Sequence, residues 1–85
     1  MIVKNKIKNY RIKYAITQDE LANEINCKKQ YISKIENNNV NIGIEMAIKI
    51  TQAIRNLTTK KSFGLQTVRI QVEDIFYIET APNKD

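Results

Sequence analysis

The stretch TQDELANEINCKKQYISKIEN, residues 17–37, decides the fold of this chain. Thr17 followed three residues later by Glu20 is a capping box, in which the hydroxyl accepts an orphan backbone amide and the carboxylate reaches back. The short helix that begins there should end near Asn26, because Asn tolerates left-handed backbone. A further helix is expected over residues 28–36. The stretch therefore predicts two short helices joined by a tight turn.

The side chains of this stretch divide into a packed face and an open face. Ala22 is small enough to let another helix cross closely, and Ile32 and Ile35 supply the packing partners. Cys27 falls in the turn, where a small apolar residue plugs the junction. The opposite face of the helix expected over residues 28–36 carries Lys29, Gln30, Tyr31, Ser33 and Lys34. Gln can bond two edges of adenine, Lys can donate to guanine or phosphate, and a helix about 10 Å wide fits a major groove about 12 Å wide.

Helical spacing extends to both sides of this stretch. One helical face is expected near the N-terminus, with Val3, Ile7, Tyr10 and Tyr14 at intervals of three and four residues. A fourth helix is expected to start near Ile44, behind Gly43. It should be buried on more than one side because its apolar residues are too many for one narrow stripe: Ile44, Ala47, Ile48, Ile50 and Ile54.

The helical pattern weakens after Arg55. Residues 68–72 alternate between apolar and polar side chains, which is typical of a half-buried strand. Residues 72–78 fit either one or two helical turns or a continuation of that strand. Residues 80–85 are expected to form a polar tail.

Composition limits the classes of function. The 85 residues suffice for one compact domain, and the net charge is +5. Residues 1–34 hold eight basic and three acidic side chains, whereas the rest of the chain is balanced, so a polyanionic partner is indicated. With one Cys and no His, the chain can form neither an internal disulfide nor any of the usual zinc ligand sets. Without a nucleophile–base pair or a phosphate-binding loop, we expect no enzyme, cofactor or small-molecule ligand.

The sequence carries no stretch of about 20 apolar residues and no signal-peptide pattern. We therefore expect a cytoplasmic protein that does not bind a membrane.

Several motifs together resemble the phage-repressor and Cro-like family, also called the xenobiotic-response-element family. They are TQDELA (residues 17–22), QYISKIEN (30–37), IEMAIKI (44–50) and VEDIF (72–76). The resemblance covers residues 2–54 and 72–78. It implies a mainly α, compact five-helix, lambda-repressor-like domain with a helix-turn-helix. The domain would span residues 1–79 and contain an insertion at about 56–71, with room there for a short strand or hairpin.

The resemblance also assigns roles to single residues. It implies base contacts by Lys29, Gln30, Tyr31 and Lys34, and backbone-phosphate contacts by Gln18 and Asn37. We add Lys28, Ser33 and Asn39 as further backbone contacts. Arg11 and Glu36 match a structural ion pair between the first and third helices. The family usually has Gly and Pro where this chain has Asn38 and Ile42, and Asn can adopt the left-handed conformation that the Gly supplies.

These features predict sequence-specific binding of double-stranded DNA by a transcriptional regulator, usually a repressor, acting as a homodimer on a near-palindromic operator. The expected dimer interface lies in and after the insertion: Phe63, Leu65, Val68, Ile70, Val72 and Phe76. A hairpin packed on its own bundle is the alternative for that segment. Two other functions stay open, namely an antitoxin-like protein-interaction module with secondary DNA binding, and nonspecific binding of nucleic acid.

Overall fold

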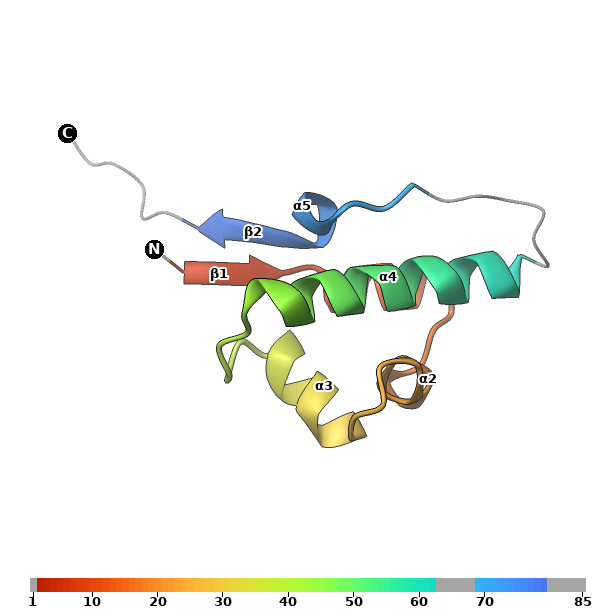
Figure 1. The fold of residues 1–85 in the computed structure, drawn as a ribbon, viewed down its shortest axis with the longest axis horizontal. Coiled ribbons are helices and arrows are strands. Elements are labelled where there is room, and N and C mark those ends of the chain that lie inside the picture. The colour runs from red at the N-terminus through yellow and green to blue at the C-terminus, as the bar shows by residue number, and fades with distance from the viewer. Residues whose placement is uncertain (1, 63–68, 80–85) are drawn as a thin grey trace.

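The computed structural model describes residues 2–62 and 69–79. Within them the chain forms five helices and a two-stranded antiparallel sheet, so the fold is mainly helical, as predicted (Figure 1). The elements are β1 (Ile2–Asn5), α1 (Ile7–Lys13), α2 (Gln18–Glu24), α3 (Lys29–Glu36), α4 (Ile44–Lys61), α5 (Val72–Ile75) and β2 (Phe76–Glu79).

The N-terminal residues form a strand, so the prediction of a helix beginning near Val3 is wrong. β1 pairs with β2 in an antiparallel ribbon in which Val3 faces Ile78 and Asn5 faces Phe76. The backbone amide of Lys6 continues the pairing by donating to the carbonyl of Ile75 over 2.7 Å. The helical spacing of Val3 is thus overridden by a partner at the far end of the chain, and α1 begins only at Ile7.

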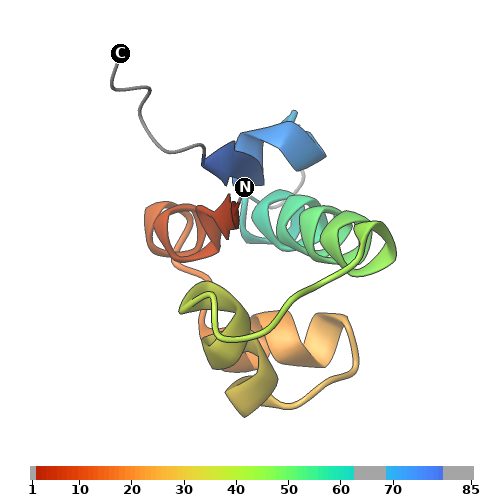
Figure 2. The same ribbon diagram turned by 90° about the vertical axis from the view of Figure 1, so that its left-hand side faces the viewer.

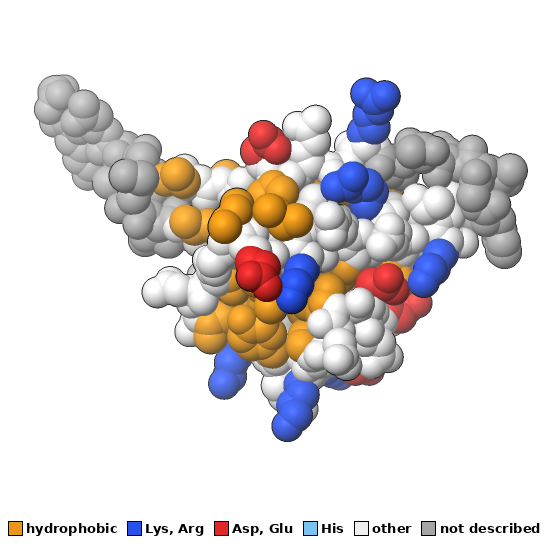
Figure 3. All heavy atoms as spheres, viewed as in Figure 1, with side chains coloured by type: hydrophobic (Ala, Val, Ile, Leu, Met, Phe, Trp, Pro, Cys, Tyr) orange, Lys and Arg blue, Asp and Glu red, His pale blue; other side chains and the backbone are white. Residues whose placement is uncertain are grey.

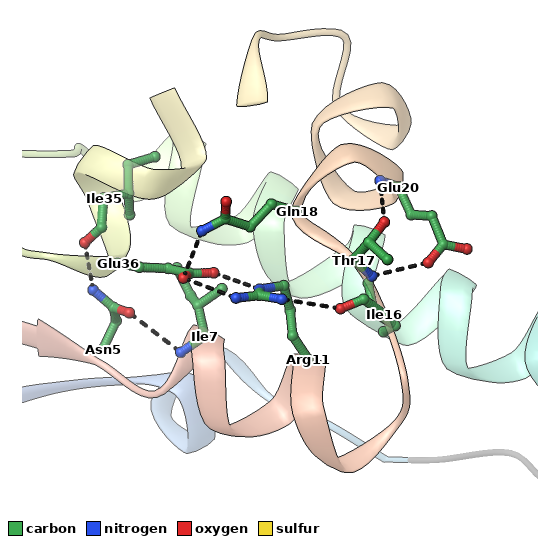
Figure 4. A network of polar contacts seen from close by, with 9 residues as sticks. All are labelled: Asn5, Ile7, Arg11, Ile16, Thr17, Gln18, Glu20, Ile35 and Glu36. Carbon is green, nitrogen blue, oxygen red and sulfur yellow. Dashed lines mark hydrogen bonds and ion pairs between the residues drawn. The ribbon is translucent and has the colours of Figure 1, made fainter. Parts of the chain in front are cut away.

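The capping box at the start of α2 is present as predicted. The backbone amide of Glu20 donates to the Thr17 hydroxyl over 3.0 Å, and the amide of Thr17 donates to the Glu20 carboxylate over 2.9 Å (Figure 4). The helix ends at Glu24, and Asn26 follows with a φ of 59°. Asn26 therefore takes the left-handed conformation that reverses the chain.

Helix α4 is longer than its sequence pattern suggests. It begins behind Gly43 as expected, but it runs on to Lys61 rather than fading after Arg55. Leu57 and Thr58 in the added turns are buried at 8% and 2% exposure, so tertiary packing sustains the helix where its pattern weakens. About a third of the supposed insertion, residues 56–61, is therefore the end of α4.

The segment expected to be a strand is irregular where the structure describes it. Residues 69–71 form neither helix nor strand, so no strand runs into Val72. Of the two alternatives for residues 72–78, the structure combines parts of both: residues 72–75 form one helical turn and residues 76–79 form strand β2. Gln71 and Asp74 close a second capping box around this single helical turn. Ile70, one of the apolar residues of the alternating pattern, is buried in the core from this irregular segment.

The core gathers around α4. Figure 2 shows α4 with α1 beside it, α2 and α3 below it, and the ribbon with α5 above it. Its buried residues include Ala47, Ile50, Ala53 and Ile54, which share one broad face, whereas Lys49, Gln52 and Asn56 on the opposite face are exposed. These residues do not support the prediction of burial on more than one side. Ile44 and Ile48 were expected among the buried residues, but they are exposed at 71% and 40%. No helix within residues 2–62 and 69–79 is long and apolar enough to cross a membrane.

Candidate nucleic-acid interface

The turn between α2 and α3 is compact because small residues meet there. Ala22 is only 2% exposed, and its carbonyl accepts a hydrogen bond of 2.9 Å from the backbone amide of Cys27. Cys27 is half-buried against the core, so it plugs the junction only in part. Burial raises the pKa of its thiol above the ordinary value of 9.0. Helices α2 and α3 lie directly against each other (Figure 1).

Helix α3 presents one face to the core and the other to solvent. Ile32 and Ile35 are 0% and 2% exposed. Lys29, Gln30 and Lys34 are exposed, whereas Tyr31 and Ser33 are half-buried. Tyr31 packs partly against the core, so less of its ring is open than the sequence alone suggested. The exposed row supplies the amide and ammonium donors that base edges and phosphates accept.

The cations on and beside this face are not used internally. No ion pair among the described residues involves Lys28, Lys29 or Lys34, and both Lys28 and Lys34 are exposed. By contrast, Lys60 and Lys61 near the end of α4 pair with Glu24 and Glu20 of α2. Open positive charge therefore stands at the start and on the outer face of α3, where it can meet a polyanion.

A polar network anchors α3 to α1 and α2. The structure brings Arg11 and Glu36 together in a two-point ion pair, with Nε at 2.5 Å and Nη2 at 3.0 Å from the two carboxylate oxygens (Figure 4). The Gln18 amide donates to the same carboxylate over 3.1 Å. Arg11 also donates to the carbonyl of Ile16 over 3.1 Å. Since the Arg11 and Glu36 side chains are only 12% and 5% exposed, this network fixes how α3 is presented.

Asparagines close the C-terminal end of α3. Asn37 is the C-cap, and Asn38 follows with a φ of 59°, so it takes the left-handed conformation that Gly usually supplies at this place. The amides of Asn38 and Asn39 return to carbonyls of α3 over 3.0 and 2.9 Å. All three side chains are exposed, and Asn37 and Asn39 thus stand at the edge of the α3 surface.

Asn5 is a residue of this region that the sequence did not single out. Its side-chain amide donates to the carbonyl of Ile35 over 2.8 Å and to the side-chain oxygen of Asn38 over 3.2 Å. Its side-chain oxygen accepts from the amide of Ile7 over 3.2 Å (Figure 4). Asn5 therefore ties the end of α3 to both β1 and α1. No local sequence pattern predicts this contact, because Asn5 and Ile35 are 30 positions apart.

Of the residues predicted to form a dimer interface, the structure describes Ile70, Val72 and Phe76. Ile70 and Phe76 are 3% and 8% exposed within the core of their own chain, and Val72 is partly buried against it. Phe63, Leu65 and Val68 lie outside the described residues. Among the residues described, no group of three or more Cys, His, Asp or Glu side chains could hold a metal ion.

Comparison with known proteins agrees with this geometry. A helix-turn-helix family model of the Cro/C1 type matches residues 7–59, which is more than half of the chain. An uncharacterized HTH-type transcriptional regulator of Methanocaldococcus jannaschii is 32% identical over 77 residues, which cover 91% of this chain and 96% of that protein. The chain therefore belongs to the Cro/C1-type, or xenobiotic-response-element, family of helix-turn-helix DNA-binding transcriptional regulators, which are typically not enzymes.

Proposed function

We propose that this regulator binds one specific double-stranded DNA site by placing α3 in the major groove. The supporting observation is the division of α3 into a core face held by Ile32 and Ile35 and an open face that carries Lys29, Gln30 and Lys34. Gln30 and Lys29 are the base readers, with Lys34 and the open edge of Tyr31 beside them. A good base contact of this kind discriminates against the wrong base by about 1–3 kcal/mol.

The backbone contacts surround this helix. Lys28 and Ser33 lie on α3 or at its start, Asn37 and Asn39 at its end, and Gln18 at the start of α2. Backbone contacts hold the protein in register on the duplex but carry no sequence information. Gln18 has a second partner in Glu36, so its amide both supports α3 and stands next to the proposed phosphate path.

The protein acts as a homodimer on a near-palindromic operator, because one short helix contacts too few base pairs to define a site. Two-fold symmetry places the two recognition helices about 34–36 Å apart, one turn of the duplex. A bound dimer that overlaps a promoter excludes polymerase, so we propose repression. A reporter gene with the operator placed over its promoter should lose expression when the protein is supplied, and an unchanged or raised signal would contradict repression.

Selection of bound duplexes from a random library, followed by titration at fixed salt, tests the DNA-binding proposal. Gln30→Ala should weaken binding to the selected site by about 1–3 kcal/mol and relax the base preference at one position. Lys29→Ala should weaken binding and lower its salt dependence. Gln52→Ala, at an exposed position of α4, is the matched control and should bind like the wild type. If no duplex is preferred over bulk DNA, specific recognition is wrong.

A further inference from the structure

The lysine-rich N-terminal segment carries positive charge that the α3 surface does not use. Residues 1–16 contain four lysines, one arginine and no acidic residue. The arginine, Arg11, is neutralised by its ion pair with α3. No ion pair among the described residues involves Lys6, Lys8 or Lys13, and all three are exposed. Helix α3 therefore accounts for only part of the positive charge in the first part of the chain.

Two of these lysines lie over tyrosine rings. The Nζ atom of Lys6 is 5.5 Å from the centroid of the Tyr77 ring, and that of Lys13 is 5.4 Å from the centroid of the Tyr14 ring. Tyr14 stacks in turn on Tyr10, with the ring centroids 6.4 Å apart. A cation–π contact holds an ammonium group in place without neutralising it. We call these five residues the lysine–tyrosine face.

The lysine–tyrosine face points away from the recognition helix. Lys6, Tyr10 and Lys13 are spaced by four and three residues, so they share one side of α1. Arg11, which reaches α3, comes five residues after Lys6 and two before Lys13, so it points toward roughly the opposite side. Figure 2 shows the ribbon, which carries Tyr77, above α1, with α3 below. One straight duplex on α3 therefore does not lie against this face.

The side of the domain that carries α4 has a different distribution of charge. Figure 3 shows acidic and basic side chains beside each other on that side. Lys49 pairs with Glu45 over 3.3 Å, and Lys60 pairs with Glu24 over 3.4 Å. The cations of the lysine–tyrosine face have no such carboxylate partner among the described residues. Its surplus of one sign favours a polyanion over a partner of mixed charge.

We propose that the lysine–tyrosine face binds the phosphate backbone of a second segment of duplex DNA, so that the protein bridges this segment to the one on α3. Lysine and tyrosine side chains both donate hydrogen bonds to phosphate oxygens, and such contacts carry no base preference. Lys6 and Lys13 are seven residues apart, so they stand roughly 10 Å apart along the axis of α1 and contact separate phosphates.

Two observations favour duplex DNA over other polyanions. The rings of Tyr10 and Tyr14 stack on each other, and those of Tyr14 and Tyr77 lie under lysines, so these rings are not free to stack on the bases of a single strand. An acidic protein would have to be recruited from solution. By contrast, a duplex held by α3 brings further DNA with it at high local concentration.

Capture of a second duplex by DNA-bound protein tests the proposal. The selected duplex is fixed to beads and saturated with the full chain, and a labelled duplex without the selected site is added at about 50 mM salt. The wild type should hold the labelled duplex on the beads. The double variant Lys6→Gln with Lys13→Gln should capture at least about tenfold less of it, because two phosphate contacts are lost.

The matched control removes the same charge elsewhere. Lys49→Gln with Arg55→Gln, at exposed positions of α4, should capture the labelled duplex like the wild type and bind the selected site as tightly as the Lys6 and Lys13 variant does. Lys6→Arg with Lys13→Arg keeps both charges and should also capture it. A folded Lys6→Gln, Lys13→Gln protein that captures as much as the α4 control overturns the proposal.

A single variant guards against loss of the fold. Lys13→Gln leaves the contact between Lys6 and Tyr77 intact, and far-UV circular dichroism should match that of the wild type. It should lower capture about threefold, since one of two phosphate contacts remains. Unchanged capture by this variant overturns the proposal even when the double variant does not fold.

A second probe identifies the polyanion. Poly-L-glutamate with the same number of charges as the labelled duplex replaces it in the capture experiment. The proposal expects DNA-bound wild type to hold the duplex more tightly than this polypeptide, because tyrosine and lysine together suit phosphate oxygens. Tighter capture of poly-L-glutamate, lost in the Lys6→Gln, Lys13→Gln protein, would assign the face to an acidic protein and overturn DNA bridging.

The same samples separate this inference from the proposed function. A wild type that prefers one duplex but captures no second duplex overturns bridging and leaves specific recognition by α3 in place. A wild type that prefers no duplex contradicts specific recognition, and bridging is then measured between two arbitrary duplexes. Bridging that is lost in the Lys6→Gln, Lys13→Gln protein supports the inference in that case too, and its absence in the wild type overturns it.

Discussion

Removal of the Arg11 guanidinium is the perturbation whose effect the structure defines most closely. Arg11→Ala deletes two hydrogen bonds to Glu36 and one to the carbonyl of Ile16. The Glu36 carboxylate, whose side chain is only 5% exposed, then keeps the Gln18 amide as its one described partner. The variant thus leaves a nearly buried negative charge with one neutral donor.

The expected loss of stability follows from this residual contact. Removing one member of a buried ion pair typically costs about 3–5 kcal/mol. Because Gln18 still donates to Glu36, we expect a loss of about 2–4 kcal/mol for Arg11→Ala. For a domain of this size, 1 kcal/mol lowers Tm by roughly 4–8 °C, so the melting temperature should fall by at least about 8 °C.

Urea unfolding at pH 7, followed by circular dichroism, measures this difference. Lys8→Ala is the control, because Lys8 is an exposed residue of the same helix, and its removal should change the free energy of unfolding by at most about 0.5 kcal/mol. Replacing both partners, Arg11→Met with Glu36→Leu, should recover most of the stability, since no buried charge is left unpaired. Equal stabilities for Arg11→Ala and Lys8→Ala would refute the argument that this pair anchors α3.

Three further predictions concern other contacts. Asn5→Ala removes the donor to the carbonyl of Ile35, so it should lower the free energy of unfolding by about 1–2 kcal/mol and weaken DNA binding. The control Asn9→Ala, at an exposed position of α1, should do neither. Urea unfolding and DNA titrations check both results. Lys61 and the backbone amide of Thr17 lower the pKa of Glu20, so its stabilising contribution is present above the ordinary value of 4.5 and is lost as pH falls through the lower folded pKa. Lys61→Met should therefore flatten the acid side of the stability profile below that value, and an unchanged acid limb would count against the contact. Burial raises the pKa of Cys27, so an alkylating reagent at pH 7.5 should modify it more slowly in the folded protein than in urea, and equal rates would show an open thiol.

The helix-turn-helix was predictable from the sequence because its signals are local. The capping box of Thr17 and Glu20 joins residues three positions apart, and Asn26 needs only its own backbone preference to turn the chain. The two faces of α3 follow from helical spacing alone, with Ile32 and Ile35 on the core side. Each of these features involves residues within one or two helical turns, so the sequence displays them directly.

Tertiary structure decided the strand pairing and the burial for which the sequence carries no local signal. Val3 fits a helical face by spacing, yet it forms a strand because Ile78 pairs with it, 75 positions along the chain. Ile70 and Phe76 could have covered either a partner or their own core, and the closing of β2 and α5 over α4 buries them in the latter. Ile44 and Ile48 stay exposed, although they follow the helical spacing of the buried residues of α4. Apolar character predicts which residues tend to be buried. Only the assembled fold shows which of them are buried, because burial depends on how the helices and strands pack together.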